Sequence, residues 1–354
     1  MRMLDFRLWA VVAHKDDTGL GRQARDVRKV LSLGRHIVIP SERLTNHPLD
    51  PHDEVLLSPD APEARVKEVL QGLQGIMFFE RAGWHPDLLR CARELGVATV
   101  GVPNWEWFRS EDEAWNYCDL FACPNEMALK TVRSFGRSNS IRLPWCIDLE
   151  SLPVRTIQGP ARTFVHNAGL VDADDRKGTR DTIESFRRTR LKEIRLIVRL
   201  QKEVPLPDAD DRIDVRVGNV ESHADLYRDG DVAIQPSKME GIGFGILEAV
   251  CAGLPVITTD YPPMNEYVLQ PELRVQTRWW NRRAFPTPWV KQAHLRLPRR
   301  GDLVRRIERC AEHDMAEFSR QNRAWAEEVF SRDHLRRQWS EALGAHLFST
   351  GPRS

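Results

Sequence analysis

The stretch DVAIQPSKMEGIGFGILEAVCAGLPVIT, residues 231–258, decides how this chain folds. Its apolar start predicts a strand, which a Pro-Ser turn follows. The three glycines at 241, 243 and 245 let a ligand approach the backbone closely, because glycine has no Cβ. A helix predicted to begin near Phe244 would direct unpaired amides and a partial positive charge at that ligand.

Two carboxylates bracket this glycine loop. Glu240 precedes it and can accept hydrogen bonds from hydroxyls of a group resting on the loop. Glu248 is expected in the first helical turn, where it could hold a vicinal diol such as that of ribose. A glutamate in the first turn of a helix is by itself more often a helix cap or a partner of the helix dipole. The G-x-G-x-G run also differs from the dinucleotide-binding pattern G-x-G-x-x-G, because only one residue separates its last two glycines. The whole ordered string therefore carries the prediction of a site for a sugar joined to a nucleotide.

The rest of the chain repeats one α/β pattern twice. Short apolar runs alternate with amphipathic stretches up to residue 143, stop at a Pro-containing linker, and restart at 162. Strands buried on both faces and separated by helices predict parallel sheets wrapped by helices. We expect two Rossmann-like, doubly wound domains, 1–150 and 151–330, that face a cleft, followed by a helical tail, 331–354.

Composition excludes several classes of protein. The 354 residues suit two domains, and 52 Lys plus Arg against 51 Asp plus Glu argue against wholesale coating of nucleic acid or membrane. No apolar run approaches the ~18–20 residues that cross a bilayer, and charges interrupt the region of a signal peptide. The six cysteines form no CxxC pair, which excludes a disulfide scaffold or zinc ribbon. We expect a cytoplasmic protein, with peripheral membrane association left open.

The ordered string resembles the Glu-x7-Glu signature of retaining glycosyltransferases with the GT-B fold, in particular glycosyl transferase group 1 (family 4). Val217-Gly218 and Leu226-Tyr227 are similar to that family's approach to the same site, and Thr18–Arg22 to its first glycine loop. The resemblance implies a C-terminal helix that packs back on the N-terminal domain. It also implies that a nucleotide-diphosphate sugar, a co-substrate and no cofactor, binds the C-terminal domain, and that a glycan, lipid-linked or small-molecule acceptor binds the N-terminal one.

The resemblance assigns roles on the donor side. Glu248 would hold the ribose, and Glu240 the hydroxyls of the transferred sugar. Lys177 matches a lysine that offers positive charge to the leaving diphosphate; alternatively it is a solvated lysine at a helix start. The other implied donor contacts are Gly241, Ile242, Gly243, Phe244, Gly245, Gly218 and Arg176.

The chain departs from the family at one position on the donor side. The family commonly places an arginine directly after the preceding strand, where this chain reads Gly169-Leu170. Arg176 is the candidate substitute for that second cation. No metal is implied, because Asp172, Asp174 and Asp175 are expected to form a solvated turn.

On the acceptor side the candidates follow two predicted strands. Gly19 and Gly21 open a helix N-terminus suited to a diphosphate or acceptor, unless they only form a tight turn. Asn104 and Glu106 alternate with Trp105 and Trp107, at a place where many relatives of the family have a histidine. Glu106 could position the acceptor hydroxyl or take its proton; alternatively the tryptophans belong to the core.

The segment 273–300 stands out by its charge. It holds eight Lys or Arg, no Asp or Glu, and three tryptophans at 279, 280 and 289. It looks like an insertion relative to the family. It could bind an anionic acceptor, a lipid headgroup or nucleic acid, or be a surface loop whose arginines pair with acids elsewhere.

These observations lead to one main hypothesis with three alternatives. The main one is a retaining glycosyltransferase of the hexosyltransferase type. The alternatives are a nucleotide-sugar epimerase on the same fold, a non-catalytic nucleotide-sugar-binding module, motivated by the missing Gly-Arg pair, and a transferase acting on nucleic acid.

Overall fold

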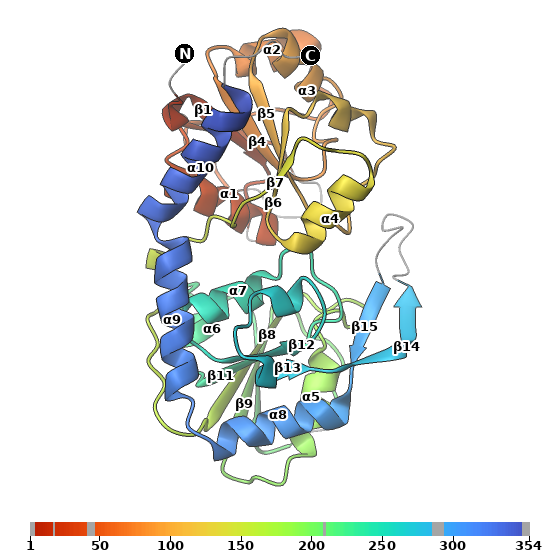
Figure 1. The fold of residues 1–354 in the computed structure, drawn as a ribbon, viewed down its shortest axis with the longest axis vertical. Coiled ribbons are helices and arrows are strands. Elements are labelled where there is room, and N and C mark those ends of the chain that lie inside the picture. Colours follow the sequence, from red (N-terminus) through yellow and green to blue (C-terminus); the bar gives the residue numbers. More distant parts are fainter. Residues whose placement is uncertain (1–3, 17, 41–46, 208–209, 285–293, 349–354) are drawn as a thin grey trace. The chain divides into compact units, whose positions relative to one another are not determined.

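The computed structural model describes residues 4–16, 18–40, 47–207, 210–284 and 294–348. The chain divides into two compact units, one of Met1–Asp148 with Phe330–Ser354 and one of Leu149–Val329 (Figure 1). Both are built on a parallel sheet, so the predicted pair of doubly wound α/β sheets is confirmed.

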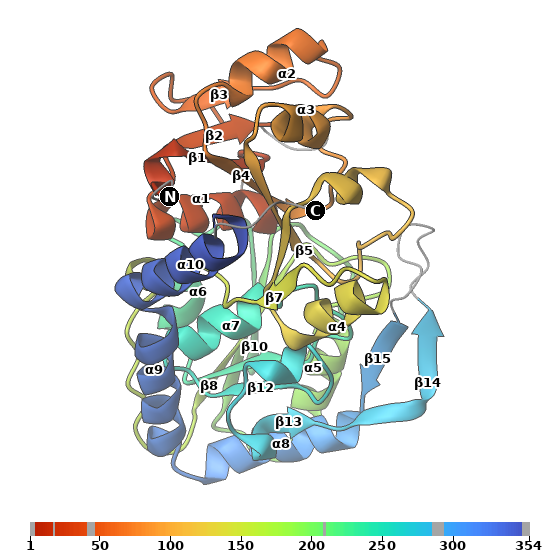
Figure 2. The same ribbon diagram turned by 45° about the horizontal axis from the view of Figure 1, so that its top comes forward.

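The first unit holds a seven-stranded parallel sheet of order β3-β2-β1-β4-β5-β6-β7 (Figure 2). Every residue of β1 is buried, as expected for a strand covered on both faces. The C-terminal helix α10 packs on α1 of this unit, and Trp339 Nε1 donates a hydrogen bond to the Pro144 carbonyl at 3.1 Å. The elements are β1 (Trp9–Ala13), α1 (Gly19–Leu31), β2 (Arg35–Val38), β3 (Glu54–Leu56), α2 (Glu63–Leu70), β4 (Gly75–Glu80), α3 (Leu88–Glu94), β5 (Ala98–Pro103), β6 (Leu120–Cys123), α4 (Glu126–Ser134), β7 (Ser140–Arg142) and α10 (Arg332–Leu347).

The second unit holds a six-stranded parallel sheet of order β10-β9-β8-β11-β12-β13, and a separate antiparallel ribbon of β14 and β15. The elements are β8 (Thr163–Gly169), α5 (Thr179–Arg187), β9 (Arg195–Leu200), β10 (Ile213–Val217), α6 (Asp225–Arg228), β11 (Val232–Gln235), α7 (Phe244–Cys251), β12 (Val256–Thr259), β13 (Arg274–Val275), β14 (Thr277–Ala284), β15 (His294–Pro298), α8 (Arg300–Glu312) and α9 (Ala316–Phe330).

Eleven strands lie within one residue of the apolar runs that predict them, which are 8–13, 35–39, 75–79, 97–102, 119–123, 140–143, 162–168, 194–200, 213–217, 231–235 and 255–259. The short edge strands β3 and β13 were not predicted, because three and two residues carry too little apolar pattern. The helix α1 begins at Gly19, so the predicted helix N-terminus at Gly19 and Gly21 is confirmed. In the part of the chain that is described, no helix has the length and apolar character needed to span a bilayer.

Candidate active site

The glycine loop after β11 ends in the helix α7, which begins at Phe244 as predicted. Its N-cap Gly243 has φ of 84°, a left-handed conformation that favours glycine. Gly241 and Ile242 are buried, whereas Phe244 and Gly245 are half-buried. Since Glu248 is the fifth residue of α7, the prediction that it lies in the first helical turn is wrong.

Glu240 is buried in an ion pair with two cations. The Lys177 Nζ lies 2.7 and 2.9 Å from the two carboxylate oxygens, and Arg176 Nη1 lies 3.4 Å from Oε2. Burial alone would raise the pKa of Glu240, but the charges of Lys177 and Arg176 outweigh burial and hold it below its usual value. At neutral pH Glu240 is therefore a charged carboxylate, held in one orientation, that can accept hydrogen bonds. The structure brings Glu240, expected to hold the transferred sugar, together with Lys177 and Arg176, the cations expected at the leaving diphosphate.

A close backbone approach positions these cations. Gly178 caps α5 with φ of 73°, and a Cβ there would come within 2.6 Å of the Pro236 carbonyl. The Lys238 amide donates to the Arg176 carbonyl at 2.7 Å, so the two loops are joined directly. Lys177 lies two residues before α5 begins, at the turn and not in the helix.

Asp175 corrects the prediction of a solvated acidic turn. Asp172 is exposed and Asp174 half-exposed, but Asp175 is buried. It accepts from the Thr179 amide at 2.7 Å and pairs with Lys238 Nζ at 3.1 Å, which fixes the start of α5. The N-cap of α5 is Gly178, so Asp175 acts from outside the usual capping position, and no sequence signal marked it.

His166 holds the same helix start from the sheet side. It lies in the middle of β8 and is fully buried. Its Nδ1 lies 2.7 Å from the Ile234 carbonyl and its Nε2 3.0 Å from Thr179 Oγ1. Burial lowers the pKa of His166, so the ring is neutral and links β8 to β11 and α5. Sequence reasoning did not single it out.

Glu248 has partners of its own. Its Oε2 accepts from the Tyr227 hydroxyl at 2.7 Å, and its Oε1 lies 2.8 Å from His223 Nε2. Glu248 and Tyr227 are buried, whereas His223 is half-exposed. Sequence reasoning assigned His223 no role at the site, so its contact with Glu248 was missed.

The remaining donor-side candidates lie at the edges of this region. Arg176 Nη1 also lies 3.3 Å from the Met239 carbonyl. Gly218 is exposed with φ of 117°, and its amide donates to the Leu200 carbonyl at 2.8 Å. Leu170, at the position of the family's arginine, is exposed and supplies no charge.

The acceptor-side candidates lie in the first unit. Gly19 is exposed with open space around it, while a Cβ on Gly21 would come within 2.1 Å of the Asp16 carbonyl, so Gly21 serves close packing. Asn104 and Glu106 are buried after β5. Trp105 is buried between them and Trp107 is half-buried. They belong to a different unit from Glu240 and Lys177.

The basic segment forms the β14–β15 ribbon (Figure 1). Arg296 stacks on the Tyr261 ring at 4.0 Å and donates to its hydroxyl at 2.9 Å. Arg300 pairs with Asp181 at 2.6 Å and with Glu184, so part of the segment's charge is neutralised. Residues 285–293, including Trp289, lie outside the described residues, as do the side chains of 279–284.

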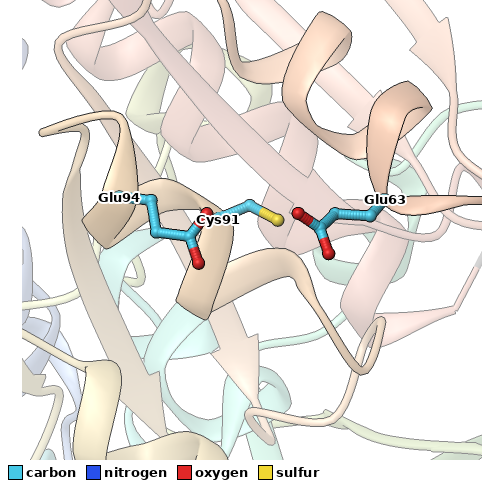
Figure 3. A group of neighbouring side chains, drawn as sticks. All are labelled: Glu63, Cys91 and Glu94. Atoms are coloured by element: carbon cyan, nitrogen blue, oxygen red, sulfur yellow. The ribbon is translucent and has the colours of Figure 1, made fainter.

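A second group of charged side chains lies in the first unit, on α2 and α3 (Figure 3). Glu63, Cys91 and Glu94 approach one another closely enough to share an ion. However, both carboxylates are paired with Lys67, at 2.6 and 2.8 Å, and with Arg90. Burial raises the pKa of the Cys91 thiol. The arrangement is an ion-pair network with a protonated thiol beside it.

The sequence and the fold were compared with those of known proteins. Residues 162–278 match the family described as glycosyl transferases group 1. No curated protein sequence matches the chain. Among solved structures, the lipopolysaccharide outer core galactosyltransferase WaaB in its apo form has a TM-score of 0.61 at 12% identity, covering 95% of this chain and 99% of that one.

Two further structures share the fold. A sucrose-phosphate synthase from Thermosynechococcus elongatus has a TM-score of 0.64 at 13% identity, covering 97% of this chain and 99% of that one. MnaA from S. aureus, solved with UDP, has a TM-score of 0.53 at 10% identity and 96% coverage of both chains. The chain thus has the GT-B fold and carries a glycosyl transferase group 1 domain. It is a glycosyltransferase.

Proposed function

We propose that the second unit binds a nucleotide-diphosphate sugar at the start of α7, and that the sugar passes with retention of configuration to a hydroxyl-bearing acceptor held by the first unit. The observation that carries the proposal is the buried Glu240 carboxylate between Lys177 and Arg176. The nucleotide sugar acts as a co-substrate, and the proposal invokes no metal or further cofactor.

The cations suit a diphosphate leaving group. Lys177 and Arg176 remain 23% and 28% exposed although both touch Glu240, so each can reach a ligand while the carboxylate holds its position. When the glycosidic bond breaks, negative charge grows on the diphosphate, and fixed positive groups stabilise that charge. Glu240 would accept hydrogen bonds from the sugar hydroxyls.

The second carboxylate suits the nucleoside. Glu248 lies on α7 and is anchored by Tyr227 and His223. A carboxylate fixed in this way loses little conformational freedom when it accepts a ribose diol. For retention, the leaving phosphate oxygen would take the acceptor's proton, and no protein nucleophile would be required.

A panel of UDP-, GDP- and ADP-hexoses tests the proposal. We expect one donor to release its nucleoside diphosphate, slowly even with water as acceptor. Glu240→Gln should reduce release by about 10²–10³-fold, because the lost interactions act on the transition state. NMR of the released hexose, read before mutarotation, should show the donor's anomeric configuration. Absence of release from every donor, or an inverted product, would contradict the proposal.

A further inference from the structure

The seven-stranded sheet of the first unit reverses its strand order between β1 and β4. From β1 the chain adds β2 and β3 on one side, and then β4 and β5 on the other. Ligands of open parallel sheets bind outside the carboxyl ends of the strands at such a reversal. A polar residue directly follows each of three neighbouring strands: His14 follows β1, Arg81 follows β4 and Asn104 follows β5.

His14 presents a hydrogen-bond acceptor at this edge. Its Nδ1 lies 2.8 Å from the Ile39 carbonyl, which can only accept, so Nδ1 carries the proton. In the neutral ring the Nε2 atom is then left with a lone pair. The ring packs edge-on against Trp84 at 4.9 Å, which fixes its plane, and the residue is half-exposed.

The chain makes a strained turn at the end of β4. Glu80 has φ of 68°, and the Arg81 amide donates to the Phe79 carbonyl at 2.7 Å, which closes a γ-turn of a rare type. Non-glycine residues keep such conformations where the surroundings enforce them, commonly at functional sites. This turn places the Arg81 guanidinium over the Trp84 ring at 5.1 Å. Trp84 therefore contacts both His14 and Arg81.

Asn104 supplies an independent indication of a ligand. Its neighbour Pro103 pairs with Glu80 across β4 and β5, so Asn104 follows β5 at the level where the γ-turn follows β4. Asn104 is only 8% exposed, and its Oδ1 has no hydrogen-bond partner among the described residues. Buried acceptors are rarely left without a donor, and a ligand hydroxyl would supply one.

We infer that His14, Arg81 and Asn104 form a subsite for a sugar that carries a phosphate or carboxylate group, and that this sugar is the acceptor. Its hydroxyls donate to His14 Nε2 and Asn104 Oδ1, and its anionic group pairs with Arg81, for which no ion pair is seen within the described part of the chain. Calling the sugar an acceptor rests on the proposed function, whereas its binding to the first unit does not.

Titration of the full chain with three probes tests this subsite. Imidazole nitrogen NMR follows His14, whose signal is assigned by its loss in His14→Asn. Glucose 6-phosphate or glucuronate should shift the His14 Nε2 signal saturably, and unmodified glucose should bind more weakly. Tighter binding of glucose 6-phosphate would identify a phosphate as the anionic group, and tighter binding of glucuronate would identify a carboxylate.

Arg81→Ala should weaken binding of the preferred anion by about tenfold or more, as expected for a charge-assisted hydrogen bond. The control is Arg93→Ala, since Arg93 is also exposed and stacks on Tyr117 at 5.0 Å, but lies in α3. Unchanged His14 signals with both anions, or equal effects of the two variants, would overturn the inference. Nucleotides play no part in this titration, so failure here leaves the donor proposal standing.

Discussion

The Lys177–Glu240 pair should be energetically coupled, and a double-mutant cycle of Lys177→Met and Glu240→Gln measures this coupling. Their side chains are 23% and 6% exposed and share contacts of 2.7 and 2.9 Å. Exposed pairs contribute less than about 1 kcal/mol, while removing one partner of a buried pair costs about 3–5 kcal/mol. We expect a coupling near 2 kcal/mol for this half-sheltered pair.

The two single variants should differ in a defined order. Glu240→Gln leaves Lys177 and Arg176 as adjacent like charges, whereas Lys177→Met leaves Glu240 with Arg176 at 3.4 Å. Glu240→Gln should therefore be the more destabilising. Hydrogen exchange of peptides from β11 and α7 reads the local free energy of opening without requiring both units to unfold together.

The control for this cycle is an exposed ion pair of the same unit. Arg162 and Glu193 lie 3.5 Å apart with side chains 53% and 55% exposed, and their coupling should be near zero. The reasoning would be refuted if the Lys177–Glu240 coupling matched that of the control pair, or if Lys177→Met destabilised the unit more than Glu240→Gln.

Three further predictions concern the scaffold. Gly178→Ala should destabilise the second unit by more than the roughly 1–2 kcal/mol of a left-handed alanine, because its Cβ also meets Pro236; an unchanged melting temperature would contradict this. Tyr227→Phe should cost about 1–3 kcal/mol, since it removes a donor from the buried Glu248 carboxylate; denaturant unfolding that matches the wild type would exclude it. Burial lowers the pKa of His36 from 6.5 to about 4, so as the pH falls the unfolded chain binds this proton before the folded chain does. The free energy of unfolding should therefore decrease between pH 6.5 and 4, by up to about 3 kcal/mol. His36→Gln should reduce this pH dependence in hydrogen exchange of β2, and a pH dependence identical to that of the wild type would count against the prediction.

The sequence predicted the sheets well because buried parallel strands leave continuous apolar runs. It also predicted that Lys177 and Glu240 serve one site, although 63 residues separate them, because the resemblance assigned each a role toward the same ligand. The short edge strands carry too few residues to show a pattern.

The partners of the site residues were harder to predict. The contact of His223 with Glu248 depends on the packing of the α6 segment against α7, which single-sequence patterns do not encode. Asp175 looked solvated because it stands among other acids, yet the turn before α5 buries it against Lys238. The tautomer of His14 follows from a contact with Ile39, 25 residues away. Such facts come from tertiary packing.

Isothermal titration of the wild-type chain and Glu248→Gln with UDP, GDP and ADP measures whether Glu248 holds the nucleoside of the donor. We expect at least one nucleoside diphosphate to bind the wild type with 1:1 stoichiometry. The variant should bind it about tenfold more weakly or worse, because a carboxylate that takes both hydroxyls of a diol is lost. Binding of none of the three to the wild type, or equal affinity in the variant, would contradict the account.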